Sequence, residues 1–199
     1  MTTQPLAGRV NQKQRTRTAI VEAARELIST SAEVTMPAVA KAALVSEATA
    51  YRYFPDLVSL LREAVDGTWP SPDEALAPVA NCGDPVERIA FATEHLLQHV
   101  WRYQSAVRAM IAASIVRPGS AAMRPGLRFG LIEHALAPLA ADDKLRPEAL
   151  GQLKVDLALV MSAEALFTLT DLCQLPPDSA IASAVRTARV VTAAALTAD

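Results

Sequence analysis

Residues 35–54 read TMPAVAKAALVSEATAYRYF, and this stretch decides the fold. It contains two places where a helix can begin, because the side-chain oxygens of Thr35 and Ser46 can each accept a hydrogen bond from an N–H group of the first turn. Pro55 follows the stretch and disfavours a helical conformation in the residue before it. The stretch therefore predicts two short helices of about seven residues each, joined by the turn 43–45.

A longer helix precedes this pair, and another follows it. Apolar side chains ahead of the pair recur at the spacing of one helix face: Ile20, Ala24, Leu27 and Ile28. This spacing predicts an amphipathic helix from about Lys13 to Ser29. After the pair, Asp56 can cap a fourth helix that ends near Gly67. The first 66 residues therefore read as four helices around one small core, and the first three form a helix-turn-helix unit.

The chain as a whole has the composition of an all-α protein. It has 199 residues, of which 51% are hydrophobic, 20% are charged and 39 are alanine. Alanine has the highest helix propensity, and this share of hydrophobic residues can fill a core, which excludes a disordered segment. We expect a three-helix helix-turn-helix domain over residues 1–66 and a larger helical domain over residues 67–199, with about nine to ten helices in all.

Capping residues and prolines mark the helices of the second domain. Ser71-Pro72-Asp73-Glu74 and Asp84-Pro85-Val86-Glu87 each combine a capping residue, a proline at the first helical position and a glutamate that can close a capping box. Further breaks occur at prolines and glycines. The longer helices are predicted over residues 85–101, 103–116, 127–139 and 147–173, with a last helix that reaches Leu196.

The charge of the chain is uneven along its length. The formal net charge is −2, but residues 1–65 hold eight Lys or Arg residues against six Asp or Glu residues. Arg9, Lys13, Arg15 and Arg17 lie near the start with no acidic residue among them. Such a cluster is typical of a segment that binds phosphate groups.

Neither secretion nor membrane insertion is expected. Cys82 and Cys173 lie far apart, and the chain begins without a basic and apolar leader, so a secreted disulfide scaffold is not expected. There is no run of 18 apolar residues, so we expect no membrane span. We expect a cytoplasmic protein.

A long helix, a short helix, a turn and a second short helix make up a helix-turn-helix DNA-binding module. Residues 12–66 resemble the DNA-binding domain of the TetR/AcrR family of bacterial transcriptional regulators. The most specific fragment is Val45-Ser46-x-x-Thr49-x-Tyr51-x-Tyr53-Phe54. The family usually has a glycine where this chain has Leu44, and often a lysine where it has Leu57. The backbone at Leu44 therefore either has a negative φ angle or bears the strain of the left-handed region.

The resemblance implies that the helix after Ser46 enters the major groove of DNA. Glu47 could then accept a hydrogen bond from cytosine, and Ala48 or Thr49 could contact a thymine methyl group. Arg52 would reach guanine or phosphate, while hydroxyl groups and further cations would bind phosphates. The residues expected to bind DNA are Lys13, Arg15, Arg17, Thr35, Lys41, Ser46, Glu47, Ala48, Thr49, Tyr51, Arg52 and Tyr53.

The second domain resembles the effector-binding and dimerisation part of the same family. The predicted helix 147–173 is apolar on more than one side, whereas one core covers a single stripe. A four-helix bundle from two chains would cover the rest, although both helices could also be internal to one chain. The residues expected at this homodimer interface are Leu153, Leu157, Val160, Ile181, Val185, Ala188 and Thr192.

An effector pocket would combine apolar side chains with a few polar groups. The residues expected to bind a small-molecule effector of unknown identity are Phe91, His95, Met110, Ser114, Phe129, His134, Met161, Glu164 and Phe167. Each of them could instead be an ordinary core or surface residue.

Other kinds of site have less support in the sequence. His95 and His99 have the spacing of two metal ligands on one helix, but no third ligand is evident, so no metal and no cofactor are expected. The common enzyme motifs do not occur. We expect a dimeric repressor that binds a palindromic operator and is released by a small apolar ligand. The alternative is a constitutive DNA-binding protein, or a helical interaction protein, without an effector.

Overall fold

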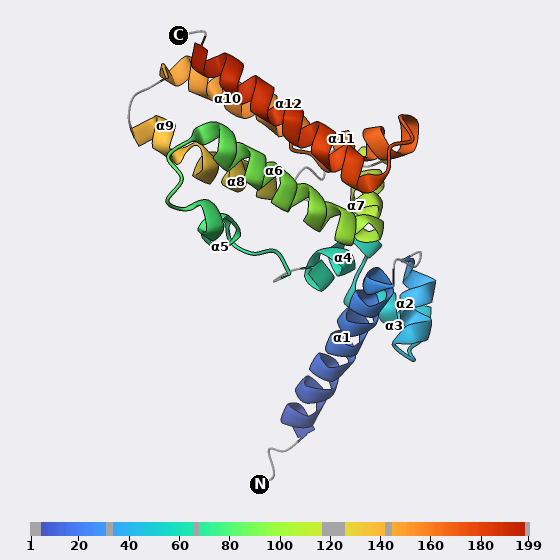
Figure 1. Cartoon of the computed structure of the whole chain (residues 1–199). Coiled ribbons are helices and arrows are strands. Elements are labelled where there is room, and N and C mark those ends of the chain that lie inside the picture. Colours follow the sequence, from blue (N-terminus) through green and yellow to red (C-terminus); the bar gives the residue numbers. More distant parts are fainter. Residues whose placement is uncertain (1–4, 31–33, 66–67, 117–125, 142–144, 198–199) are drawn as a thin grey trace. The chain divides into compact units, whose positions relative to one another are not determined.

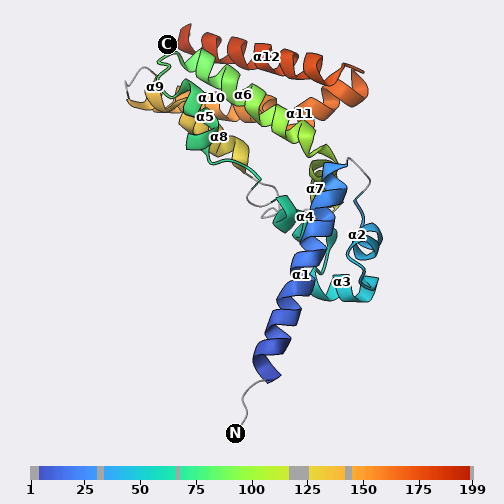
Figure 2. The ribbon, with the colours of Figure 1, turned by 60° about the horizontal axis from the view of Figure 1, so that its bottom comes forward.

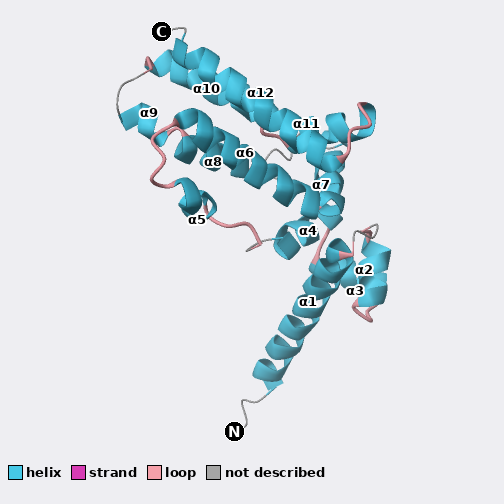
Figure 3. Cartoon of the chain, viewed as in Figure 1, coloured by secondary structure: helices cyan, strands magenta, loops and turns pink. Residues whose placement is uncertain are grey.

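The computed structural model describes residues 5–30, 34–65, 68–116, 126–141 and 145–197. All regular structure in these ranges is helical, as Figure 3 shows, and the predicted all-α class is confirmed. The described residues form twelve α-helices, compared with the nine to ten that we expected. The difference comes from predicted helices that break into shorter ones.

The chain divides into two compact units, which are described separately (Figure 1). The first unit comprises residues 1–69 and 103–124, and the second comprises residues 70–102 and 125–199. The expected division was a single cut after residue 66. The first unit additionally contains residues 103–124 because α7 packs against α4.

Five helices make up the described part of the first unit. They are α1 (Pro5–Ser29), α2 (Met36–Ala42), α3 (Glu47–Tyr53), α4 (Leu57–Val65) and α7 (Gln104–Val116). α1 packs against α2 and α4, and α2 packs against α3. In Figure 2, α3 lies across the end of α2.

Three capping side chains start the short helices of this unit at the predicted places. Oγ1 of Thr35 accepts a hydrogen bond from the N–H group of Ala38 at 3.3 Å, and Oγ of Ser46 accepts one from Thr49 at 3.2 Å. An Asp56 carboxylate oxygen accepts a hydrogen bond from the N–H group of Ser59 at 2.7 Å. Each cap satisfies a backbone donor that has no partner within its helix.

Apolar side chains from every helix of the first unit meet in its core. The fully buried ones include Ile20, Ala24, Val39, Ala50, Phe54, Leu60, Leu61 and Ala106. Burying one leucine or isoleucine side chain contributes about 1.5–3 kcal/mol. The short helices α2 and α3 are therefore held by this core rather than by their own propensity.

The second unit is a stack of longer helices. Its elements are α5 (Pro72–Leu76), the 3-10 turn Ala77–Val79, α6 (Pro85–Arg102), α8 (Leu127–Ala135), α9 (Ala137–Ala141), α10 (Pro147–Val160), α11 (Ala163–Phe167), the π-helical turn Thr168–Leu172 and α12 (Pro177–Thr197). α12 lies along α6 and also packs on α10, while α8 packs on α5, α6 and α10.

The predicted helix 147–173 is not continuous, which corrects the sequence prediction. α10 ends at Val160, and Ser162 takes an extended conformation whose Oγ accepts a hydrogen bond from the N–H group of Ala165 at 3.0 Å. A serine that competes for backbone hydrogen bonds favours such a cap over a helix interior. The predicted helix 127–139 is likewise divided, at Leu136, into α8 and α9.

One of the two predicted capping boxes is confirmed. Ser71 and Glu74 exchange hydrogen bonds at the start of α5. The hydrogen bonds that the Glu74 carboxylate accepts from the backbone and hydroxyl of Ser71 lower the pKa of Glu74. Asp84 caps α6, but Glu87 forms an ion pair with Arg189 of α12, at 2.7 Å between Nη2 and Oε2. The prediction that Glu87 closes a box was wrong because a distant partner attracts the carboxylate more strongly than the local N–H group.

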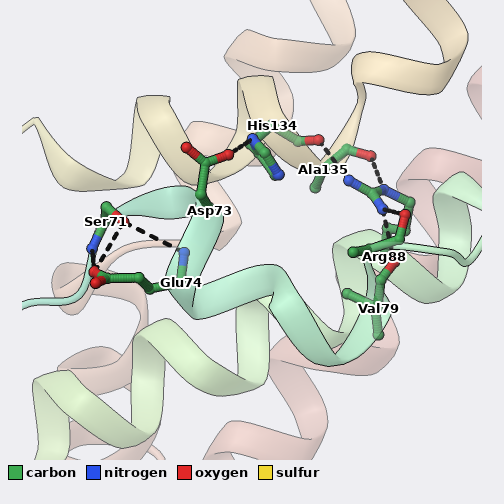
Figure 4. A network of polar contacts seen from close by, with 8 residues as sticks. Ser71, Asp73, Glu74, Val79, Arg88, His134 and Ala135 are labelled. Carbon is green, nitrogen blue, oxygen red and sulfur yellow. Dashed lines mark hydrogen bonds and ion pairs between the residues drawn. The ribbon is translucent and has the colours of Figure 1, made fainter.

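A buried arginine joins three elements of the second unit. Arg88 of α6 is only 4% exposed and donates hydrogen bonds to the carbonyl oxygens of Val79, Ala80, His134 and Ala135, at 2.7–3.3 Å. These carbonyls lie at the ends of the 3-10 turn and of α8, where helix dipoles favour a cation. Figure 4 shows this network beside the ion pair of His134 with Asp73, at 3.3 Å.

α12 is long and apolar enough to cross a membrane, judged by length and composition alone. It also carries Arg186 and Arg189, and its buried residues face α6 and α10. Packing within the second unit therefore accounts for the buried part of the apolar surface of this helix.

Candidate nucleic-acid interface

The start of α3 presents its side chains away from the core. Ala50 is completely buried, so the opposite side of the helix faces the solvent. Glu47, Ala48 and Arg52 are exposed, and Tyr51 is 47% exposed. The predicted base-reading residues are thus accessible to a duplex, apart from Thr49, which is half-buried and contacts Ser46 through its hydroxyl at 2.9 Å.

A groove of about 530 Å³ lies between α1 and α3. It is lined by Gln12, Lys13, Thr16, Val45, Thr49, Arg52 and Tyr53. We call it the α1–α3 groove. It brings together four of the residues predicted to bind DNA, Lys13, Thr49, Arg52 and Tyr53, from segments more than thirty positions apart in the sequence.

The α1–α3 groove has the chemistry of a phosphate-binding surface. None of its seven lining residues is acidic, and two are cationic. The amide of Gln12 and the hydroxyl of Tyr53 supply neutral hydrogen-bond donors beside these cations. Such a combination binds the backbone of a nucleic acid by charge and by hydrogen bonds.

A family model described as "Bacterial regulatory proteins, tetR family" matches residues 20–64. The match contains all of α2 and α3 together with the turn between them. The chain carries the helix-turn-helix domain of the TetR family. It is therefore a DNA-binding transcriptional regulator and not an enzyme. A comparison with curated proteins found no match.

Sequence reasoning missed three residues of the groove in this TetR-family domain. Gln12 and Thr16 lie on the same face of α1 as Lys13, and Thr16 donates a hydrogen bond to the carbonyl of Gln12 at 3.1 Å. Val45 comes from the turn before α3. The four-residue spacing of Gln12 and Thr16 could have indicated a common face, but nothing local indicated that α3 lies opposite them.

Four further residues predicted to bind DNA lie outside the groove and form two pairs. Arg15 and Lys41 are exposed on α1 and α2 and can reach solvent or phosphate. Thr35 and Ser46 cap α2 and α3, so their hydroxyl oxygens already accept hydrogen bonds from the backbone. Their role in the structure is to fix the two helices, and each hydroxyl keeps a proton that it can donate.

Arg17 is held by contacts within the first unit. Its guanidinium forms a two-point ion pair with the Glu63 carboxylate of α4, with 2.9 Å between Nε and Oε1. The same group lies 4.5 Å from the ring centroid of Phe54 and donates to the carbonyl of Tyr53 at 3.4 Å. Arg17 therefore links α1 to α4, and its contact with a phosphate stays a prediction.

The turn between α2 and α3 settles the conformation of Leu44. Its φ angle is 55°, in the left-handed region. The N–H group of Val45 donates to the carbonyl of Ala40 at 2.9 Å and that of Leu44 to Lys41 at 3.2 Å, the pattern of a Schellman helix end. This pattern requires a left-handed residue at position 44, which costs about 1–2 kcal/mol for an L-amino acid with a side chain.

The predicted effector residues are not gathered at one described site. Met110 is buried in the first unit, and the side chain of Ser114 lies outside the described residues. The other seven belong to the second unit. None of these nine residues lines the α1–α3 groove, and none lines the second groove that the structure describes, which lies between α6 and α12.

Three of these seven residues are either exposed to solvent or in contact with a charged side chain. Phe129 is exposed, His134 is paired with Asp73, and Glu164 lies 3.5 Å from Arg128. Met161 and Phe167 are buried in the core of the second unit.

Phe91 and His95 of α6 lie next to each other. Their rings stack at a centroid distance of 6.3 Å, and Nε2 of His95 is buried without a hydrogen-bond partner among the described residues. One turn later, burial, together with smaller contributions from Arg102 and His95, lowers the pKa of His99 to about 4. Among the described residues there is no cluster of three His, Cys, Asp or Glu residues that could hold a metal ion.

The predicted dimer residues lie mostly inside the protomer. Leu153, Leu157, Ile181, Ala188 and Thr192 are buried, while Val160 and Val185 are partly exposed. The exposed apolar side chains of the same helices are Val155, Leu159 and Val190. Five of the seven residues expected at the interface are therefore core residues of the protomer, because both sides of α10 and α12 carry apolar residues and periodicity alone does not distinguish them.

Proposed function

We propose that this regulator is a repressor that binds a near-palindromic operator as a homodimer and leaves it when a small apolar ligand binds. The acid-free α1–α3 groove beside the exposed start of α3 is the observation that carries the proposal. The groove holds the phosphates that flank the half-site, and Glu47 and Ala48 read base edges in the major groove. The protein acts in the cytoplasm, where bacterial operators lie.

An exposed apolar strip supports the homodimer. Leu159 of α10 is 77% exposed, and Val155 lies one turn before it on the same face. Val190 is the exposed apolar residue of α12. Two copies of α10 and α12 that pack through these residues form a four-helix bundle with a two-fold axis, and this axis relates the two DNA-binding domains.

The Phe91–His95 pair supports an effector site in the second unit. An aromatic face and a buried, unsatisfied nitrogen together suit a small, mainly apolar molecule with one hydrogen-bonding group. Such a ligand releases DNA only if it binds one arrangement of the two domains more tightly than the other. A coupling of about 1–3 kcal/mol weakens operator binding roughly 5- to 150-fold.

The operator is found by selecting genomic fragments with the purified full-length protein and then titrating the recovered duplex at several salt concentrations. We expect log affinity to fall linearly with log salt, and the fragments to share an inverted repeat with half-sites about 34–36 Å apart or a multiple of it. Equal affinity for a scrambled duplex of the same length and composition contradicts the operator proposal.

The effector part is tested by screening compounds for two effects together, a higher melting temperature and a lower operator affinity. A compound that has both effects should lose them in His95→Phe but keep them in His134→Phe, because His134 is occupied by Asp73. Bound DNA must lower the affinity for the compound by the same factor by which the compound lowers the affinity for DNA. If every stabilising compound leaves operator affinity unchanged, the effector part fails.

The second candidate is a constitutive DNA-binding protein without an effector. It is favoured by the surroundings of the residues that were expected to bind a ligand, since His134 and Glu164 have ion-pair partners and Met161 and Phe167 are core residues. In that case operator affinity depends on protein and salt concentration alone.

A further inference from the structure

Leu44 is exposed in a way that the rest of the domain does not explain. Its side chain is 93% exposed, more than any other large apolar side chain that the structure describes. Single exposed leucines are common on protein surfaces. This one, however, also occupies the left-handed conformation at φ 55°, which disfavours every side chain with a Cβ atom.

The turn imposes this conformation on whatever residue stands at position 44. The Schellman hydrogen bonds close α2 so that Ser46 can start α3 two residues later. A glycine would meet this requirement without strain. The leucine side chain gains nothing in exchange within the described chain, because almost none of its surface is buried.

The position of the turn indicates what could contact this side chain. Val45, the next residue, lines the α1–α3 groove with Lys13 and Thr49. Leu44 therefore lies beside the surface where cationic and hydroxyl groups are arranged for phosphates. An apolar face of another protein would have to bury these charged neighbours, whereas a duplex offers phosphates for them and carbon atoms for the leucine.

We propose that Leu44 is a DNA contact of this regulator, whose side chain packs against apolar carbon atoms of the operator beside the bases read by α3. The thymine 5-methyl group in the major groove is the main apolar group of this kind, and deoxyribose carbons are the other. The proposal rests on operator binding by the first unit. If Leu44 contacts a thymine methyl group, it contributes to sequence specificity. If it contacts a sugar, it contributes to affinity for any sequence.

The experiment compares the full-length protein with Leu44→Gly, Leu44→Asn and Leu44→Met. Glycine and asparagine both relieve the left-handed strain but remove the hydrocarbon, while methionine keeps a flexible apolar side chain. We expect Leu44→Gly and Leu44→Asn to raise the melting temperature and to weaken binding of the selected operator about fivefold, as for one or two buried methylene groups. Leu44→Met should retain most of the affinity.

Replacing thymine by uracil in the operator removes the 5-methyl groups and identifies the contact. Loss of affinity in the unmodified protein, but not in Leu44→Gly, assigns the contact to a thymine methyl group. If Leu44→Gly loses the same amount of affinity on the thymine duplex and on the uracil duplex, the contact is assigned to deoxyribose. If Leu44→Gly is more stable and binds the operator as tightly as the unmodified protein, the Leu44 contact is excluded while operator binding stands. If the unmodified protein does not bind duplex DNA, the proposed function and this contact both fail.

Discussion

Arg17 of α1 and Glu63 of α4 are joined by a two-point ion pair, with 2.9 Å between Nε and Oε1. Eight residues along α1, Arg25 donates a hydrogen bond to the carbonyl of Ala64 at 2.8 Å. α1 therefore holds α4 at two positions. These contacts connect α4 to the helix that forms one side of the α1–α3 groove.

Removing the Glu63 carboxylate should change both stability and DNA binding. We expect Glu63→Ala to lower the free energy of unfolding by about 0.5–1 kcal/mol, since the pair is partly exposed and screened. It also frees the Arg17 guanidinium next to Tyr53, so non-specific duplex binding should strengthen and the salt dependence should steepen by up to about one phosphate contact. Urea unfolding and salt titrations measure the two effects.

The matched control for this prediction is Glu26→Ala, which removes the same charge from an exposed position on α1. If both variants strengthen DNA binding equally, net charge explains the effect and Arg17 plays no part in it.

Lys13 should contribute one phosphate contact through the α1–α3 groove. We expect Lys13→Gln to weaken binding similarly on all sequences and to reduce the salt slope by about 0.9, because one fewer counterion is released. Lys154→Gln removes a partly exposed lysine of the second unit, which pairs with Glu133, and should leave the slope unchanged. An unchanged slope in Lys13→Gln would show that the DNA backbone passes elsewhere.

Leu159 should be important for dimerisation but not for folding of the protomer. We expect Leu159→Glu to weaken self-association roughly thirtyfold or more, since a charge is then buried in an apolar interface, while circular dichroism is unchanged. Sedimentation at several concentrations measures the association. Ile115→Glu, at an exposed apolar residue of α7, should remain as dimeric as the unmodified protein. A stable monomer before any substitution refutes the bundle directly.

Arg88 should be essential for the stability of the second unit. Arg88→Met removes a donor from four carbonyl groups, of which only those of Val79 and His134 keep a backbone N–H donor in the hydrogen bonds that the structure describes, and we expect a loss of about 3 kcal/mol in the free energy of unfolding. Arg186→Met, at an exposed residue of α12, should change stability by no more than about 0.5 kcal/mol. Equal effects of the two substitutions in urea unfolding would contradict the role of Arg88.

His99 should make the stability of the protein depend on pH. Its pKa in the folded protein is about 4, below the ordinary value of 6.5, so the unfolded chain binds its proton more readily. This contribution to stability is fully present above pH 6.5 and is lost as the pH falls toward 4. His99→Gln should remove it, so the difference in melting temperature between variant and parent should shrink or reverse across this window. A difference that is constant with pH contradicts the prediction.

The sequence predicts best what depends on neighbouring residues. The caps at Thr35, Ser46 and Asp56 use a side chain and a backbone group three residues apart, and all three occur as predicted. The helix-turn-helix order follows from them. The left-handed residue at position 44 was one of two open alternatives, because the conformation depends on how α2 and α3 are joined in space.

The contacts that the sequence did not predict involve distant partners. The pairing of Arg17 with Glu63 was missed because the two residues are 46 positions apart, whereas the basic neighbours of Arg17 are near in sequence. Glu87 was assigned to its own helix start, although Arg189 lies opposite it on α12. On α10 the apolar residues on opposite sides, such as Leu157 and Leu159, cannot be assigned to core or interface until the neighbouring helices are placed.

α7 completes the first unit although it follows α6 in the chain. The compact unit that contains the helix-turn-helix is therefore built from two separate stretches, and its packing of α7 on α4 forms only after the later stretch has been synthesised on the ribosome. At translation rates of about 5–20 residues per second, roughly two to seven seconds separate residue 69 from residue 103. During this interval the face of α4 that α7 covers stays open to solvent or to a chaperone.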